Sequence, residues 1–170
     1  MTVSTTKKTH DPFVIIRGRD YLKLISRGMF VTNASKIFQD DVYCEVIKIG
    51  GVVRNKDRFV RRRQRLIGPN ESTLKAMEVL TRCHIVVAGQ TVACLGDWKG
   101  IKRVRKIVLD CMNNIHPIYS LKTLMIEREL ARNEQMKNKD WQPYIPHFKK
   151  IRSQTDDVKV KKKKSFDHAN

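Results

Sequence analysis

The sequence predicts an α+β fold in which a three-stranded sheet packs on helices. The first observation is the order of hydrophobic patterns over residues 42–115, which read strand, helix, helix, strand, strand, helix. The second is an apolar content of 41% in 170 residues, enough for a core in one ordinary domain or two small ones. The third is that no uncharged apolar run approaches the ~18 residues of a membrane span, and no apolar signal segment opens the chain. We therefore expect a soluble, intracellular protein.

The first 41 residues are expected to form helices that lead into a strand. An Asp-Pro pair opens a helix expected over 10–28, which a glycine ends. A shorter helix is expected over 33–39. The β-branched run VYCEVIKI over 42–49 ends at two glycines, which is typical of a strand.

Two helices and a hairpin follow. The run KDRFVRRRQRL is helical from Asn55, with Phe59 and Leu66 on one face and basic residues on the others. It ends at Gly68-Pro69-Asn70, and a second helix is expected over 71–82. HIVVA and TVACL predict two strands, and the Gly89-Gln90 pair between them fits a type II′ turn.

The C-terminal part predicts two more helices and a tail. Asp97 caps a helix that runs to Ile115, His116-Pro117 breaks it, and a further helix is expected over 118–131. The polar, lysine-rich residues 152–170 are expected to be disordered. Four side chains are expected to hold the intervening segment on the body: Trp141, Tyr144, Ile145 and Phe148.

The net charge of +18 is concentrated rather than spread. Residues 54–65, 99–106 and 149–164 carry +6, +5 and +6, which leaves the rest of the chain nearly neutral. This concentration favours a nucleic-acid footprint over a generally solvated basic surface. A cationic membrane-surface protein is a weaker alternative, because none of these stretches has a broad aromatic or leucine-rich opposite face.

The turn between the two central helices is a candidate phosphate site. A β-α-α-β-β-α unit with such a turn is the layout of a KH domain, in which a GXXG loop clamps the nucleic-acid backbone. Small residues let phosphate approach, and the N-terminus of the second helix favours an anion. Here Glu71 replaces the second glycine. On the other interpretation, the turn only separates two helices, with Asn70 as the cap of the second.

The resemblance to a known family is specific. Residues 44–132, from CEVIKIGG to ERELAR, look like the second KH domain of the KRR-R-motif family of small-subunit processome components. The similarity extends upstream through THDPFVIIRGRDYLKLISRG and KIFQDD, and downstream to Trp141 and HFKK. The basic motif reads Arg61-Arg62-Arg63-Gln64-Arg65, with arginine in place of the usual leading lysine. The loop reads GPNE where the family usually has GPNG.

The resemblance implies a type I KH domain over 42–132 with a C-terminal helical extension. Residues 1–41 would be the C-terminal part of a degenerate first KH domain that serves protein contacts, and 133–170 a peripheral segment with a basic tail. It also implies a nucleolar, non-enzymatic factor in the nucleus that binds pre-ribosomal RNA and other processome proteins, and is needed for small-subunit (18S) rRNA processing and 40S assembly.

The candidate RNA-binding residues form the arginine helix, the loop and the start of the next helix. The arginines would hold phosphates, the loop residues would shape the clamp, and Ile67 would line the groove beside it. The set comprises Arg58, Arg61, Arg62, Arg63, Arg65, Ile67, Gly68, Pro69, Asn70, Glu71, Ser72 and Lys75.

Two alternatives from other classes remain. A KH-fold protein-interaction scaffold that has lost RNA clamping is favoured by Glu71. A nuclease or RNA-modifying enzyme lacks a catalytic constellation, because the histidines are scattered and the acidic pairs at 40–41 and 156–157 suit a helix end and a tail. The four cysteines lack metal spacing and are expected in the core, so neither a metal nor a cofactor is expected. The basic residues over 99–106 either contact RNA or only solubilise their helix. The lysines over 159–164 direct the protein to the nucleolus, bind RNA, or do both.

Overall fold

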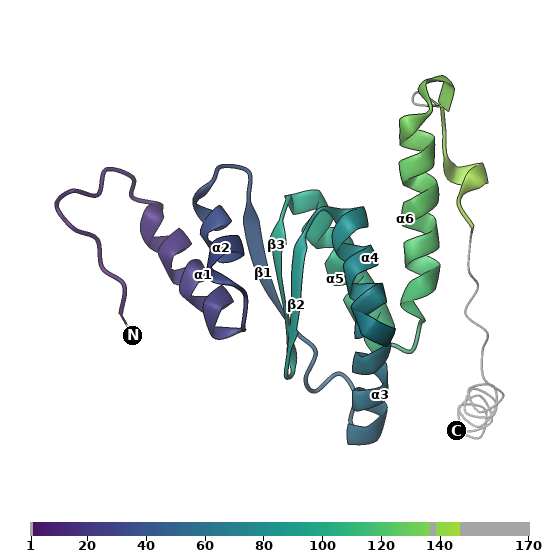
Figure 1. Cartoon of the computed structure of the whole chain (residues 1–170), viewed down its shortest axis with the longest axis horizontal. Helices are drawn as coiled ribbons and strands as arrows, with labels where there is room; N and C mark the ends of the chain where they lie inside the picture. Colours follow the sequence, from purple (N-terminus) through teal and green to yellow (C-terminus); the bar gives the residue numbers. More distant parts are fainter. Residues whose placement is uncertain (1, 137–138, 147–170) are drawn as a thin grey trace, which may run out of the picture.

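The computed structural model describes residues 2–136 and 139–146. A three-stranded sheet lies between two helical layers, with short N-terminal helices on one face and longer helices on the other (Figure 1). One further helix, α6 (Pro117–Arg132), lies outside the longer layer. The predicted α+β class and the β-α-α-β-β-α order are therefore confirmed.

The sheet is antiparallel throughout and has the order β1-β3-β2. Its strands are β1 (Tyr43–Lys48), β2 (His84–Ala88) and β3 (Thr91–Gly96). The central strand β3 is buried on both faces, whereas β1 and β2 are edges. The β2–β3 turn has Gly89 at φ +55 and Gln90 outside the positive-φ region, as the predicted type II′ turn requires.

The longer helices enclose the main core. They are α3 (Lys56–Ile67), α4 (Ser72–Thr81) and α5 (Trp98–Met112), with α6 (Pro117–Arg132) against α4 and α5. Every second residue of the strands faces them, and α5 adds a stripe at three- and four-residue steps. The largest fully buried side chains of this core are Ile49, Leu66, Met77, Val92, Ile101, Val104, Val108 and Met112.

The other face of the sheet is covered by the N-terminal residues. These form α1 (Val14–Ser26), α2 (Val31–Ala34) and the 3-10 turn η1 (Ser35–Phe38). Their buried side chains meet the alternate residues of β3, which explains why β3 has no polar face. The second core contains Leu24, Met29, Ala34, Ile37, Ala93 and Leu95.

Three expected boundaries differ. Helix α1 starts at Val14, since the Asp11 carboxylate accepts from the Phe13 N–H at 2.9 Å and forms a separate turn. The helix expected over 33–39 is a short α-turn followed by a 3-10 turn. Helix α5 ends at Met112, because Asn114 adopts φ +69 and the Ile115 N–H donates to the Asp110 carbonyl.

Beyond α6 the described chain contains two 3-10 turns, η3 (Glu134–Met136) and η4 (Gln142–Tyr144). The Trp141 indole N–H donates to the Met136 carbonyl at 2.8 Å, and Trp141 lines a hollow beside α4 and α6. Phe148 and the expected tail over 152–170 lie outside the described residues. Within the part of the chain that is described, no helix is long and apolar enough to cross a bilayer.

Candidate nucleic-acid interface

The α3–α4 loop depends on a glycine at its first position. Gly68 is buried and has φ +76, a conformation that side-chain-bearing residues rarely adopt. A Cβ there would lie 2.2 Å from Thr73 Oγ1 and 2.9 Å from the Thr73 backbone nitrogen. The first turn of α4 can therefore pack against the end of α3 only because position 68 carries no side chain.

The rest of the loop turns through two left-handed residues. Asn70 has φ +51, and Glu71 has φ +60 with ψ +17, within the 3-10 turn η2 (Pro69–Glu71). Glu71 is the N-cap of α4, but no side chain accepts a hydrogen bond there. The Ser72 N–H, the first of α4, donates to the Pro69 carbonyl, but no side chain accepts from the N–H groups that follow it, where the helix dipole favours an anion. Asn70 is not the cap that the alternative interpretation expects.

A groove of about 370 Å³ begins at this loop and continues between α4 and β2. Ile67, Glu71, Leu74 and Lys75 line it on the helical side, and residues 84–87 line it on the strand side. The third wall is formed by N-terminal residues: Gly28, Met29, Phe30 and Asn33. The groove thus joins an apolar floor to a lysine and to the open end of a helix.

Strand β2 presents its unpaired edge to the groove. One of its backbone groups is already engaged, because the Ile85 N–H donates to Glu78 Oε1 at 2.7 Å. Glu78 thereby fixes α4 to the strand and closes one hydrogen-bonding position of the edge.

The arginines of α3 divide into groups with different surroundings. Arg62 donates to the carbonyl oxygen of Met112, and Arg65 Nη1 donates to Asn114 Oδ1 at 3.0 Å. Both bonds reach the C-terminal end of α5, where cations stabilise exposed carbonyl groups. Arg62 and Arg65 therefore join α3 to α5.

The other three arginines are less engaged. Arg58 and Arg61 are exposed, while Arg63 is half-buried and lies one turn before Ile67 on the same helical face. The Arg63 Nε is buried without a hydrogen-bond partner among the described residues. Within those residues, no arginine of α3 forms an ion pair with a carboxylate, so the positive charge of the helix is not neutralised.

The predicted site residues are therefore only partly brought together. Ile67, Glu71 and Lys75 line one groove, with Gly68, Pro69, Asn70 and Ser72 forming the adjoining loop and helix start. Sequence reasoning missed the N-terminal wall and Glu78. In the sequence, an aromatic residue directly after a Gly-Met pair, Phe30, could have pointed to that wall.

The basic residues of α5 are partly paired. Arg103 Nη2 lies 3.1 Å from Glu127 Oε2 of α6, and Arg105 pairs with Glu45 of β1. The Lys102 ammonium lies 4.8 Å from the centre of the Trp98 ring. These contacts give the helix a packing role.

The cysteines are core residues, as predicted. Cys83, Cys94 and Cys111 are buried and Cys44 is half-buried. Burial raises the pKa of the Cys94 thiol to about 12 and the pKa of Cys44 and of Cys111 to about 11, so all three stay protonated at neutral pH. Among the described residues, no group of three or more His, Cys, Asp or Glu side chains could hold a metal ion.

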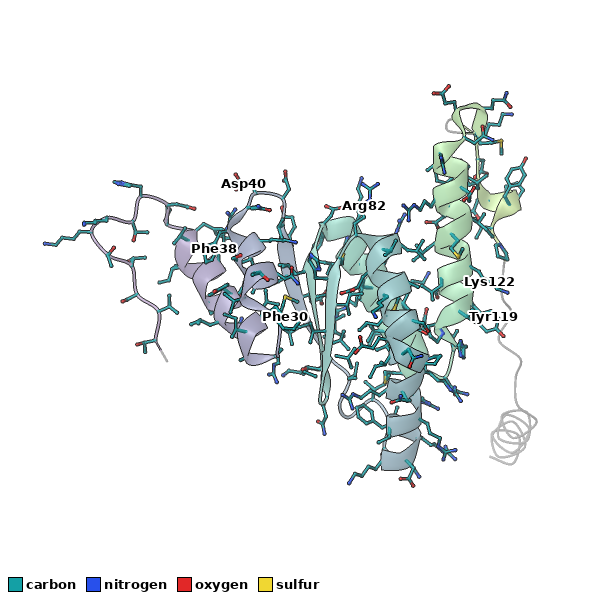
Figure 2. All side chains as sticks on the ribbon, in the orientation of Figure 1. Phe30, Phe38, Asp40, Arg82, Tyr119 and Lys122 are labelled. Atoms are coloured by element: carbon teal, nitrogen blue, oxygen red, sulfur yellow. The ribbon has the colours of Figure 1, made fainter. Side chains whose placement is uncertain are left out.

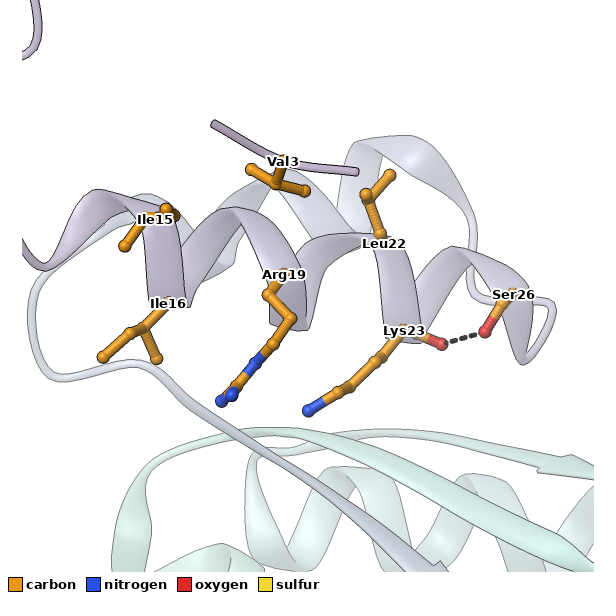
Figure 3. A pocket seen from close by; sticks show the side chains of 7 residues that line it. All are labelled: Val3, Ile15, Ile16, Arg19, Leu22, Lys23 and Ser26. Carbon is orange, nitrogen blue, oxygen red and sulfur yellow. Dashed lines mark hydrogen bonds between the residues drawn. The ribbon is translucent and has the colours of Figure 1, made fainter. Parts of the chain in front are cut away.

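A second hollow lies on the outer side of α1 (Figure 3). Val3 covers part of the helix, and Ile15, Ile16 and Leu22 give an apolar lining with Arg19 and Lys23 at its edge. The Ser26 hydroxyl donates to the Lys23 carbonyl at 2.7 Å, so it is not free for a ligand. This hollow therefore combines an apolar lining with two cationic side chains at its edge.

Comparison with known proteins gives two family matches and several similar folds. Residues 42–132 match the family described as "KRR1 small subunit processome component, second KH domain", and residues 1–40 match the "Krr1 KH1 domain". The crystal structure of Dim2p from Pyrococcus horikoshii has 25% identity and a TM-score of 0.64, over 74% of this chain and 72% of that one.

Two further structures are similar in fold. The complex of a/eIF2alpha, aDim2p and rRNA from Pyrococcus horikoshii contains a chain with 23% identity and a TM-score of 0.67, over 74% of this chain and 68% of that one. A protein of unknown function from Aeropyrum pernix has 22% identity and a TM-score of 0.64, over 75% of this chain and 68% of that one. The expected KH fold is therefore confirmed.

Proposed function

The chain belongs to the family of KRR1 small subunit processome components, and we propose that it is an RNA-binding assembly factor of that particle. It would bind pre-ribosomal RNA in the nucleolus and take part in processing the 18S rRNA precursor and in building the 40S subunit. Residues 42–132 would contact RNA, and residues 1–41 would help to recruit other processome proteins. Binding and positioning, rather than catalysis, would be its role.

The observation that carries this proposal is the open N-terminus of α4 at the mouth of the groove. No side chain caps its first turn, Gly68 lets that turn pack against the end of α3, and Lys75 lies on the adjoining wall. An RNA phosphate fits this position, and the bases that follow it would enter the apolar groove. A similarly folded chain occurs in a complex with rRNA, which also supports the proposal of RNA binding.

The sharpest test removes the groove lysine. We expect Lys75→Gln to weaken binding of short single-stranded RNA by about tenfold or more, since hydrogen bonds to charged groups contribute roughly 1.5–3 kcal/mol. Arg82→Gln is the matched control, because Arg82 is exposed at the far end of the same helix and loses the same charge. Affinity is measured by fluorescence anisotropy. If the two variants lose the same affinity, RNA binding reflects general charge attraction and not a specific contact of Lys75.

The arginine helix needs a different variant. Reversing the charge at 61–63 would also remove the bond from Arg62 to Met112, so a loss of binding could reflect damage to the fold. The exposed pair Arg58→Gln/Arg61→Gln avoids this. If both arginines hold phosphates, the slope of log affinity against log salt should fall by about 1.4, since each single-strand phosphate contact contributes about 0.7.

In cells, ultraviolet crosslinking tests the assignment directly. We expect peptides within 58–75 to crosslink to the small-subunit rRNA precursor. Crosslinks confined to the lysines over 159–164 would move RNA binding away from the KH groove.

A protein-interaction scaffold is the second candidate. It is favoured by the Glu71 carboxylate at the loop and by the apolar hollow on α1. On this view Lys75→Gln would leave RNA binding unchanged, while Ile16→Asp, in the α1 hollow, would remove processome proteins that co-purify with the chain.

A further inference from the structure

The third wall of the groove contains an aromatic ring that is exposed to solvent. The Phe30 side chain is 77% exposed, the highest value among the exposed large apolar residues of the described chain. It lines the same groove as Ile67, Leu74 and Lys75, although it belongs to the N-terminal part of the chain. Figure 2 shows it between the N-terminal helices and the sheet.

The turn that carries this ring has a fixed backbone. Gly28 turns the chain at φ +84, and the next side chain, Met29, is 3% exposed and anchored in the second core. The Phe30 carbonyl then accepts from the N–H groups of Asn33 at 3.0 Å and Ala34 at 2.9 Å. Phe30 thus sits on a fixed turn, so placing it against a ligand costs little backbone entropy.

We propose that Phe30 stacks on an RNA base, so that the N-terminal unit provides one wall of the RNA groove. This inference rests on the proposed RNA-binding function and names a residue that the loop and arginine helix do not include. A flat ring beside an apolar floor is the arrangement on which single-stranded bases stack. Asn33 on the same wall offers an amide to the edge of the base, and Lys75 opposite attracts the backbone.

The charge around the groove favours RNA over a protein segment. The lining itself carries one cation, Lys75, beside two carboxylates: Glu71, and Glu78, which accepts from the Ile85 N–H. The positive charge that favours RNA therefore comes from the neighbouring helix. The adjoining helix α3 carries five arginines without an ion pair among the described residues. A base followed by a phosphate matches an aromatic wall next to a cationic helix.

The test is Phe30→Ala in the full chain, titrated with short single-stranded RNA of mixed sequence. We expect affinity to fall by roughly five- to 150-fold, the range for losing one stacked base. The salt slope should stay unchanged, because no phosphate contact is removed. Phe13→Ala is the matched control, since that ring is also exposed but lies at the start of α1 outside the groove.

A second variant supplies a direct signal. Phe30→Trp should keep affinity within a few-fold, and RNA should quench its emission more than it quenches the wild-type chain, whose tryptophans Trp98 and Trp141 lie outside the groove. Circular dichroism would check that both variants are folded.

The outcomes separate this inference from the proposed function. If Lys75→Gln weakens RNA binding and Phe30→Ala does not, the groove binds RNA but the stacking assignment is wrong. If neither variant changes RNA affinity, the proposed function is wrong, and the inference that rests on it is wrong too. Unchanged RNA affinity together with loss of co-purifying processome proteins in Phe30→Ala would assign the ring to a protein contact and overturn the inference.

Discussion

Two substitutions of Glu71 can separate the effect of its charge on RNA binding from the effect of its left-handed backbone conformation. Its carboxylate is exposed at the mouth of the groove, next to the place proposed for a phosphate. Two negative charges about 6 Å apart repel by about 1 kcal/mol at an effective dielectric between water and a protein surface. We therefore expect Glu71→Gln to raise RNA affinity about fivefold at low salt, and less as salt increases.

Glu71→Gly adds the backbone effect. A residue with a side chain at φ +60 costs about 1–2 kcal/mol relative to glycine. Glycine lowers the free energy of unfolding by about 0.5–1 kcal/mol, because its unfolded chain has more conformational freedom. Losing a carboxylate at a helix N-terminus lowers it further, by about 0.3–1 kcal/mol. These effects nearly cancel, so we expect the free energy of unfolding to change by less than about 1 kcal/mol. An affinity gain in this variant would then reflect the loop and not the stability of the fold.

The assay is fluorescence anisotropy with short single-stranded RNA over a series of salt concentrations. Glu129→Gln serves as the control, because Glu129 is exposed on α6 and its substitution removes the same charge. The RNA affinity of both Glu71 variants should exceed that of this control at low salt, and the affinities should converge at high salt. If Glu71→Gln behaves like Glu129→Gln at the lowest salt, the loop does not face RNA and the reasoning from the open end of α4 is refuted.

Three further predictions concern stability and reactivity. Gly68→Ala should destabilise the fold by about 2 kcal/mol or more in urea unfolding, because its Cβ would meet Thr73 and φ is +76. Arg62→Ala should cost about 1–3 kcal/mol by the same measurement, since the Met112 carbonyl loses a charged donor. The buried Cys94 thiol, whose pKa is raised from 9.0 to about 12, should resist alkylation at pH 8 until the chain unfolds, and its contribution to stability should be intact below pH 9 and decline as pH rises toward 12.

Local patterns predicted the elements well. The apolar stripe of α5, the alternation in β2 and β3, and the Gly89-Gln90 turn depend on residues close in sequence, and each is present in the structure. The predicted ends of helices were less accurate, because local turns outside the apolar pattern decide where a helix stops. The left-handed Asn114 ended α5 three residues early, which hydrophobic periodicity alone does not indicate.

The candidate site was harder to predict, because its walls come from distant segments. Phe30 and Lys75 are 45 positions apart in the chain and share one groove only because the N-terminal helices cover the sheet. The contact between Glu78 and the Ile85 N–H likewise depends on which strand is an edge. No periodicity within either segment carries that information.

The arginine motif illustrates why a basic run is not equal to a binding footprint. Residues 61–65 are helical, so consecutive arginines point in different directions about 100° apart. Arg62 and Arg65 reach the C-terminal end of α5, and they stabilise the same helix pair that holds the loop in place. We therefore expect Arg62 and Arg65 to affect the proposed RNA binding only indirectly, through the position of Gly68 and the start of α4. On this proposal, direct phosphate contacts would be made by the arginines without such partners and by Lys75. Substitutions at 62 and 65 should then lower stability and affinity together, whereas Lys75→Gln should lower affinity alone.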